Sequence, residues 1–103
     1  MNDDIPYCYC LVRADLSHAQ QIVQSAHSCL EAGKQFAHAG ETHLVALRVK
    51  NEQRLMRAAM ELHAAGVKYA FFFEPDGNVG YTAIATEMIV GDKRRIFEKY
   101  PLI

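Results

Sequence analysis

The chain has 103 residues, half of them hydrophobic, and a formal net charge of −1. Such a length holds one domain, which we expect to span residues 1–103, and the hydrophobic content excludes a disordered chain. The nearly balanced charge excludes tight nucleic-acid binding by the surface as a whole. No apolar run approaches the roughly 20 residues that cross a bilayer, and the acidic start lacks the basic residues of a targeting peptide. We therefore expect a cytoplasmic protein with no membrane contact.

The first predicted strand covers residues 7–13, YCYCLVR, which are apolar on both faces as in a central strand. Asp15 or Ser17 then caps a helix, because a short side-chain oxygen accepts hydrogen bonds from the free amides of a first turn. We expect this helix to end at Gly40. Its apolar residues recur at helical spacing and predict one buried stripe, made of Ile22, Val23, Ala26, Cys29, Leu30, Gly33, Phe36 and Ala37. Polar residues flank this stripe at Gln20, Gln24, His27 and Glu31.

A second strand is predicted over residues 43–49, HLVALRV, with Asn51 as the cap of the next helix. Gly66 is expected to end that helix. Its apolar stripe is Leu55, Ala58, Ala59, Leu62 and Ala65.

The third predicted strand, residues 68–73, contains three phenylalanines that we expect to be largely covered. Residues 74–80 are rich in Pro, Asp, Gly and Asn and predict a turn. A short fourth strand is predicted over 82–86, and a short charged helix begins at Gly91 and stops before Pro101.

This alternation predicts an α/β fold, a three-layer α/β/α sandwich with a mixed four-stranded sheet. The first two strands should be parallel, because a strand–helix–strand connection is a right-handed crossover. The loop between the last two strands is too short for a crossover helix, so one of them should run antiparallel or swap edges. A ferredoxin-like regulatory domain is a weaker alternative, since that class orders its elements β-α-β-β-α-β.

Three cysteines, Cys8, Cys10 and Cys29, do not form a secreted disulfide framework. We expect reduced, buried thiols. Zinc binding by three thiolates and a histidine is the alternative, but the spacing matches no Cys-x2-Cys ribbon or finger, so we expect no metal and no cofactor.

Basic residues gather in two places, and both clusters are interpreted as solvated faces, with RNA binding left open. The first cluster is Arg48, Lys50, Arg54 and Arg57, and the second is Lys93, Arg94, Arg95 and Lys99.

Five segments occur in an order that resembles the type II peptidyl-tRNA hydrolase family over nearly the full length. They are VRADL at 12–16, Gln24 to His27, the strand HLVALRV, the Asn-Glu-capped helix with its Ala-Gly-Val exit, and Thr82 to Ala85. The resemblance implies a compact α/β/α sandwich that cleaves the ester between a peptide and the 3′ end of tRNA. It makes tRNA the expected partner.

The resemblance also implies catalytic residues. His27 and Thr82 fall on the family's positions, and Glu74 best matches its aspartate, with Asp76 close enough to compete. The lysine that the family carries before its helix has no counterpart in residues 17–21. That difference favours the alternative function, a non-catalytic module on the same fold that binds tRNA or a protein.

Ester hydrolysis needs a base to activate water and a donor to stabilise the oxyanion. His27 suits the base because an imidazole titrates near neutral pH, Glu74 or Asp76 could orient it, and Thr82 could donate to the substrate carbonyl. Arg13 or His18 could replace the missing cation. Arg13, Asp15, His18, Gln24 and Asp76 are therefore the expected substrate-binding residues, although Asp15 also suits a helix cap. The apolar strands leave room for a homodimer.

Overall fold

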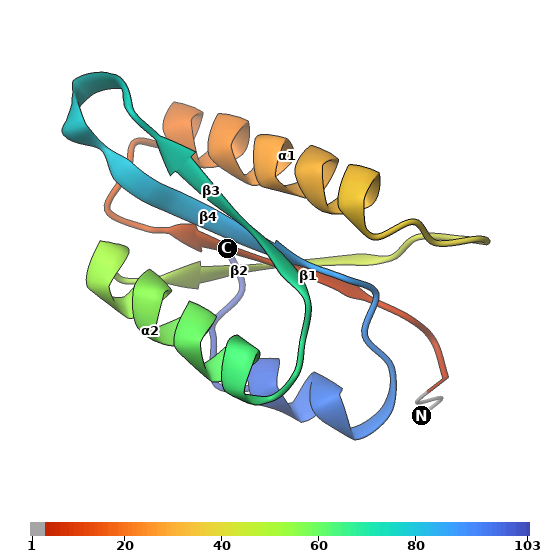
Figure 1. Cartoon of the computed structure of the whole chain (residues 1–103). Coiled ribbons are helices and arrows are strands. Elements are labelled where there is room, and N and C mark those ends of the chain that lie inside the picture. The colour runs from red at the N-terminus through yellow and green to blue at the C-terminus, as the bar shows by residue number, and fades with distance from the viewer. Residues whose placement is uncertain (1–3) are drawn as a thin grey trace.

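Four strands form one mixed sheet in the computed structural model, which describes residues 4–103 (Figure 1). The strands are β1 (Cys8–Arg13), β2 (Leu44–Val49), β3 (Tyr69–Glu74) and β4 (Gly80–Thr86). Their order across the sheet is β2-β1-β4-β3. β1 and β2 are parallel, and β4 runs antiparallel to both β1 and β3. The prediction of a mixed four-stranded sheet is confirmed, and the element order β-α-β-α-β-β excludes the ferredoxin-like alternative.

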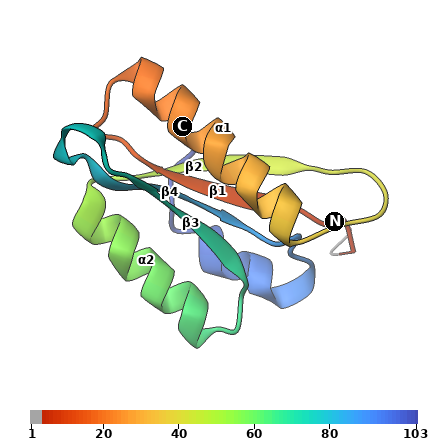
Figure 2. The same cartoon turned by 45° about the horizontal axis from the view of Figure 1, so that its top comes forward.

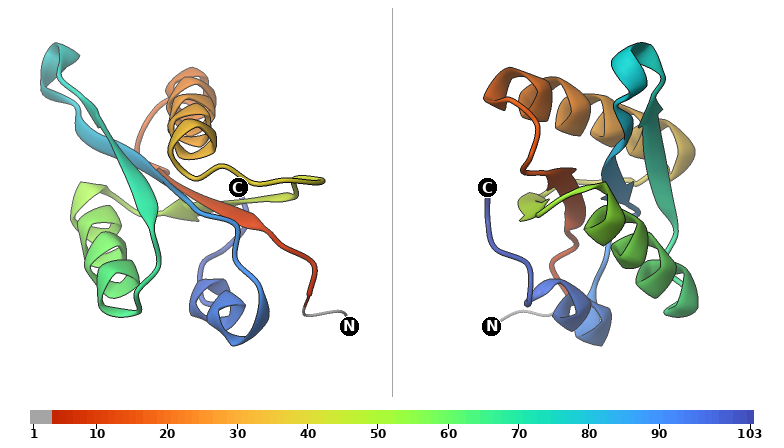
Figure 3. Two further views of the ribbon diagram at one scale, coloured as in Figure 1. Left: turned by 45° about the vertical axis from the view of Figure 1, so that its right-hand side comes forward. Right: turned by 90° about the vertical axis from the view of Figure 1, so that its left-hand side faces the viewer.

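Two α-helices cover opposite faces of the sheet (Figure 3). α1 (His18–Gln35) connects β1 to the neighbouring edge strand β2, and α2 (Glu52–Ala64) returns from β2 across the sheet to the other edge at β3. Both connections join parallel strands and are expected to be right-handed, so the reversal of direction places the helices on opposite faces. A 3₁₀-helix, η2 (Gly91–Phe97), lies beside α2. Within residues 4–103 there is no helix that is both long and apolar enough to cross a membrane.

The larger core lies between the sheet and α2. Leu55, Ala58, Ala59 and Leu62 of α2 are buried as the sequence predicts, and they pack with apolar side chains of the sheet that include Leu11, Leu47 and Ile84. The predicted cap is also confirmed, since Asn51 Oδ1 accepts from the Arg54 amide at 3.0 Å. Gly66 follows the last turn with a φ of +75°, a conformation that favours glycine.

The predicted buried stripe of α1 is wrong. Ile22, Val23 and Leu30 are 69%, 57% and 72% exposed, while Gln24 and Ser28 are buried. The sheet under this helix carries small side chains, among them Ala70 and Ala85. A close helix approach to such a surface requires small or flat partners, so α1 turns its polar and small face inward.

The end of α1 and the cover of β3 also differ from the predictions. α1 ends at Gln35, because Phe36 leaves helical geometry to pack on the small cluster of Ala32, Ala70 and Ala85. Gly40 lies in the loop beyond, with a φ of +103°. Phe73 is half exposed, since β3 is an edge strand.

The chain end adds a short pairing to the free edge of β2. Leu102 forms an antiparallel bridge with Leu47. The Arg48 amide donates to the Pro101 carbonyl at 3.0 Å, and the Ile103 amide donates to the Ala46 carbonyl at 3.2 Å. This tail therefore covers backbone groups of β2 that would otherwise face solvent.

Candidate functional site

Polar side chains meet at the carboxyl end of β1. Figures 1 and 2 show that this end lies beside the β3–β4 turn and the first residues of both α-helices. In open α/β sheets, ligands bind at such edges, where the crossover connections change direction. The sequence predictions for Arg13, Asp15, Gln24 and Glu74 all refer to this region.

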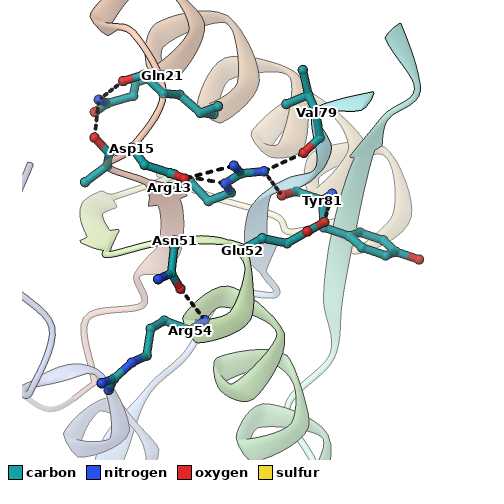
Figure 4. Close-up of polar contacts among 10 residues, drawn as sticks. Arg13, Asp15, Gln21, Asn51, Glu52, Arg54, Val79 and Tyr81 are labelled. Atoms are coloured by element: carbon teal, nitrogen blue, oxygen red, sulfur yellow. Dashed lines mark hydrogen bonds and ion pairs between the residues drawn. The ribbon is translucent and has the colours of Figure 1, made fainter. Parts of the chain in front are cut away.

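Arg13 is the centre of a clamp that holds the β3–β4 turn (Figure 4). Its Nε and Nη2 donate to the two carboxylate oxygens of Asp15, each at 3.0 Å. Its Nη1 donates to the carbonyls of Val79 at 2.6 Å and Tyr81 at 3.1 Å. The hydrogen-bonded guanidinium lowers the pKa of the Asp15 carboxyl. Ser17, not Asp15, caps α1. Arg13 and Asp15 are thus brought together, but most of their polar side-chain atoms are used in hydrogen bonds within the protein.

Glu52 completes this clamp from α2. Its Oε2 accepts from the Tyr81 amide at 2.7 Å. The carboxylate also passes so close to Gly80 that a Cβ there would lie 2.1 Å from Oε2, and Gly80 has a φ of +83°. Sequence reasoning did not predict a role for Glu52 or Gly80. A glycine beside a predicted strand was the available signal, because it often marks a close approach of another group.

Thr82 and Gln24 form a buried polar pair between β4 and α1. The pairing of β3 with β4 shifts by one residue, since Phe72 opposes Ala83 and Phe73 opposes Tyr81, which leaves Thr82 as the extra residue of a β-bulge. Thr82 Oγ1 donates to Gln24 Oε1 at 2.8 Å and lies 3.5 Å from the Phe72 carbonyl. Thr82 is fully buried, so its hydroxyl is used in the fold.

Glu74 joins the same network from the end of β3. Gln24 Nε2 donates to Glu74 Oε2 at 3.3 Å and to Gln20 Oε1 at 3.1 Å. Glu74 Oε1 also accepts from the Asp76 amide at 3.1 Å, which stabilises the turn. Three of the predicted residues, Gln24, Glu74 and Thr82, therefore converge, with Gln24 as the link between the other two.

His27 lies one turn along α1 from Gln24 and is exposed. Its ring contacts the ring of Phe72, with 4.1 Å between the centroids. In the described structure neither Glu74 nor Thr82 hydrogen-bonds the imidazole. His18, at the start of α1, and Asp76, in the turn, are exposed as well. The three residues expected to be catalytic are thus neighbours, but the base is not joined to its expected partners.

A basic groove of about 930 Å³ lies on the other face of the sheet, between β2, α2 and the residues before the tail. Five basic and two acidic side chains line it. They are Arg48, Lys50, Arg54, Arg57 and Lys99, with Asp15 and Glu61. Lys99 comes from the second basic cluster of the sequence, and folding brings it to the first.

The acidic groups of the basic groove already have partners. Asp15 pairs with Arg13, and Glu61 binds both Lys99 and the Tyr100 hydroxyl. Burial of Tyr100, aided by the Glu61 charge, raises the pKa of its phenol to about 12. Within the described residues, Lys50, Arg54 and Arg57 form no ion pair, and the Arg54 side chain extends away from the Arg13 clamp (Figure 4). The groove therefore offers three free cations to an anionic ligand.

The cysteines are free thiols; the predicted burial is confirmed for Cys10, whereas Cys8 and Cys29 are partly exposed. In the part of the chain that the structure describes, no group of three or more His, Cys, Asp or Glu side chains has the arrangement of a metal site.

The fold and this edge define the class: a small α/β sandwich with a mixed sheet and a polar carboxyl edge. The sequence matches no family model and no curated protein. Among solved structures, the chain is similar to a protein of unknown function, Atu0240 from Agrobacterium tumefaciens strain C58, with a TM-score of 0.70 and 12% identity. The match covers 96% of this chain and 98% of that one, and it concerns the fold alone.

Proposed function

We propose that the protein is a non-catalytic module that binds a phosphate-bearing partner, tRNA or another structured RNA, in the basic groove. The observation that carries this proposal is the set of Lys50, Arg54 and Arg57, which form no ion pair within residues 4–103, in a groove whose carboxylates are already paired. Lys and Arg side chains bind phosphate oxygens strongly, and release of counterions from RNA supplies most of the affinity. The resemblance to peptidyl-tRNA hydrolases makes tRNA the first ligand to test.

The overall charge of −1 favours RNA binding at a local surface. A uniformly basic protein would attract RNA to every face, whereas here positive charge is concentrated at one groove. Binding should therefore be local and weak to moderate, and it should depend steeply on salt.

The test is tRNA binding measured by fluorescence anisotropy over a range of salt concentrations. We expect the double variant Arg54→Gln/Arg57→Gln to weaken binding at least about tenfold and to reduce the salt slope by about 1–2, because two phosphate contacts are lost. Both side chains are exposed on α2, so the variant should fold. Arg95→Gln is the matched control, since Arg95 is exposed and lies outside the groove. Equal loss of affinity in the control, or no binding by the wild type, would reject the groove.

Ester hydrolysis at His27 is the second candidate function, favoured by the link from Thr82 through Gln24 to Glu74 beside it. Two observations rank it lower. First, the Thr82 hydroxyl is buried and hydrogen-bonded within the fold. Second, His27 and the basic groove lie on different faces of the sheet. His27 contacts the edge strand β3 on the α1 face, whereas the groove borders the other edge strand, β2, on the α2 face.

Release of tRNA from a peptidyl-tRNA ester distinguishes these two functions. We expect no release by wild-type protein at concentrations that saturate tRNA binding. Turnover that disappears in His27→Ala but persists in the matched variant His38→Ala would establish the hydrolase instead.

Self-association stays a prediction. The outward face of α1, made of Ile22, Val23, Ala26 and Leu30, is the apolar surface on which a second copy would pack. Sedimentation velocity at high protein concentration tests it: a wild-type dimer that Leu30→Lys converts to a monomer would support the homodimer, and a monomeric wild type would reject it.

A further inference from the structure

The three thiols gather between the sheet and α1, far from the basic groove. Cys8 and Cys10 are two residues apart on β1, so both point to the face that α1 covers, and Cys29 comes from that helix. Cys10 is fully buried, with its Sγ 3.6 Å from the Ser28 hydroxyl, whereas Cys8 and Cys29 are partly exposed. Small side chains between helix and sheet, such as Ala32 and Ala85, allow the close approach.

A cavity of about 280 Å³ opens onto two of these thiols. Cys8 and Cys29 line it, together with Phe36, His38, His43 and Met88. Cys10 is fully buried and is not among the residues that line the cavity. A small solute that enters the cavity would therefore meet Cys29 and Cys8 first. We call this space the thiol cavity.

The pKa values of the three thiols are shifted in opposite directions. Hydrogen bonds from Cys10, Cys8 and Ser28 stabilise the Cys29 thiolate and lower its pKa. The same hydrogen bonds to Cys29, together with burial, raise the pKa of Cys8 and of Cys10. The lowered pKa favours the thiolate form of Cys29, and the raised pKa values favour the protonated forms of Cys8 and Cys10. A thiolate is the nucleophilic form of cysteine, and a neighbouring thiol can resolve its oxidised form.

We propose that Cys29 is a peroxide-reactive thiol whose oxidised form is resolved by Cys8, giving a reversible disulfide at the thiol cavity. In the first step the Cys29 sulfur attacks one oxygen of a hydroperoxide, the O–O bond breaks, and an S–O bond forms. The sulfur loses two electrons to the peroxide, and water or an alcohol leaves after taking up a proton. In the second step the Cys8 sulfur attacks the sulfenic sulfur of Cys29, an S–S bond forms, and the hydroxyl group leaves as water with the Cys8 proton.

Cys8 is the resolving thiol because it shares the cavity with Cys29, whereas Cys10 is fully buried and does not line the cavity. The reaction needs no contact with the basic groove, so this inference stands independently of RNA binding.

The test titrates fully reduced, full-length protein with hydrogen peroxide and follows free thiols, intact mass and peptide mapping. We expect two thiols to disappear per chain, a mass loss of two hydrogens, a Cys8–Cys29 linkage in the map, and full reversal by a dithiol reductant. Cys29→Ser should abolish the reaction. Cys8→Ser should instead accumulate the Cys29 sulfenic acid, which dimedone traps. Cys10→Ser is the matched control and should keep the linkage.

The pH profile of alkylation by iodoacetamide separates a reactive site from ordinary surface thiols. Because the pKa of Cys29 is lowered, its thiolate persists as the pH falls below neutral, where a thiol of ordinary pKa near 8.5 loses about tenfold in rate per pH unit. We expect Cys29 to react at least about tenfold faster than glutathione at pH 6, after allowance for the lower nucleophilicity of a more acidic thiol. A rate equal to that of glutathione, linkage between chains, or a map without Cys8–Cys29 would overturn the proposal.

Discussion

Arg13 shows how a residue at an expected binding edge can serve the fold. Four of its hydrogen bonds go to Asp15, Val79 and Tyr81, so the guanidinium joins the end of β1 to the β3–β4 turn. Its side chain is only 12% exposed. A planar fork of donors is required for this arrangement, and a lysine ammonium cannot reproduce it.

Arg13→Lys should therefore reduce the free energy of unfolding by about 2 kcal/mol, since hydrogen bonds to a charged group are lost within a half-buried site. Urea denaturation measures this change. Arg95→Lys provides the control, because the exposed Arg95 forms a weak ion pair with Asp92 and should give a change within about 0.5 kcal/mol. Equal stability of Arg13→Lys and wild type would show that the clamp contributes little.

Gly80 and Gly33 should respond in opposite directions to the same substitution. Gly80→Ala forces the Glu52 carboxylate away from the Tyr81 amide and places a Cβ at a φ of +83°, so we expect a loss of about 2–4 kcal/mol. Gly33 lies within α1 with open space around it, and Gly33→Ala should increase stability by about 0.5–1 kcal/mol. Thermal unfolding of the two variants side by side gives the comparison. Two changes of the same sign would contradict the local geometry described above.

At the scale of elements, the sequence predicted the four strands, the two α-helices, the parallel pairing of β1 with β2 and a mixed sheet, because hydrophobic periodicity and caps are local signals. It failed for the orientation of α1. Ile22, Val23 and Leu30 read as a buried stripe, yet the small side chains of the facing sheet accept Ser28 and Ala32 instead. Complementarity between two surfaces far apart in the chain is invisible to a pattern taken from one helix.

Two substitutions test the observed orientation of α1, in which the polar and small face points to the sheet. Ser28→Leu places a bulky side chain where exposure is 0%, and overpacking should lower stability by about 1–3 kcal/mol. Leu30→Gln alters a residue that is 72% exposed and should change stability by less than about 0.5 kcal/mol. Guanidinium denaturation of both variants decides between the two orientations of α1. A larger loss of stability in Leu30→Gln than in Ser28→Leu would show that Leu30 is buried, as the sequence pattern predicted.

The candidate sites were predicted only in part. The proximity of Glu74 and Thr82 follows from their positions on either side of a predicted turn, whereas the link that Gln24 makes from within α1 was not predicted. The β-bulge that turns Thr82 inward and the arrival of Lys99 at the basic groove do not follow, since both depend on pairings set only in the folded chain.

On the scale of the whole molecule, the two strand–helix–strand crossovers place the two proposed activities on opposite faces of the sheet. The basic groove borders the carboxyl end of the parallel strands on the α2 face, and the thiol cavity borders their amino end on the α1 face. Substitutions at two distant sites that share no partner residues usually have additive effects on free energy.

RNA binding and thiol oxidation should therefore be independent. Arg54→Gln/Arg57→Gln should leave the rate of peroxide oxidation within about twofold of the wild type, and the oxidised protein should bind tRNA with an affinity within about twofold of the reduced form. Stopped-flow thiol assays and anisotropy provide the two measurements. A larger mutual effect would show that one face influences the other.

The pairing of residues 101–103 with β2 should limit association between copies of the chain in concentrated solution. An uncovered edge strand is a template on which other molecules can stack through their backbones, the first step toward fibrous aggregates. Residues 101–103 occupy that template from within the same molecule. Three terminal residues thus help to keep neighbouring copies from joining edge to edge.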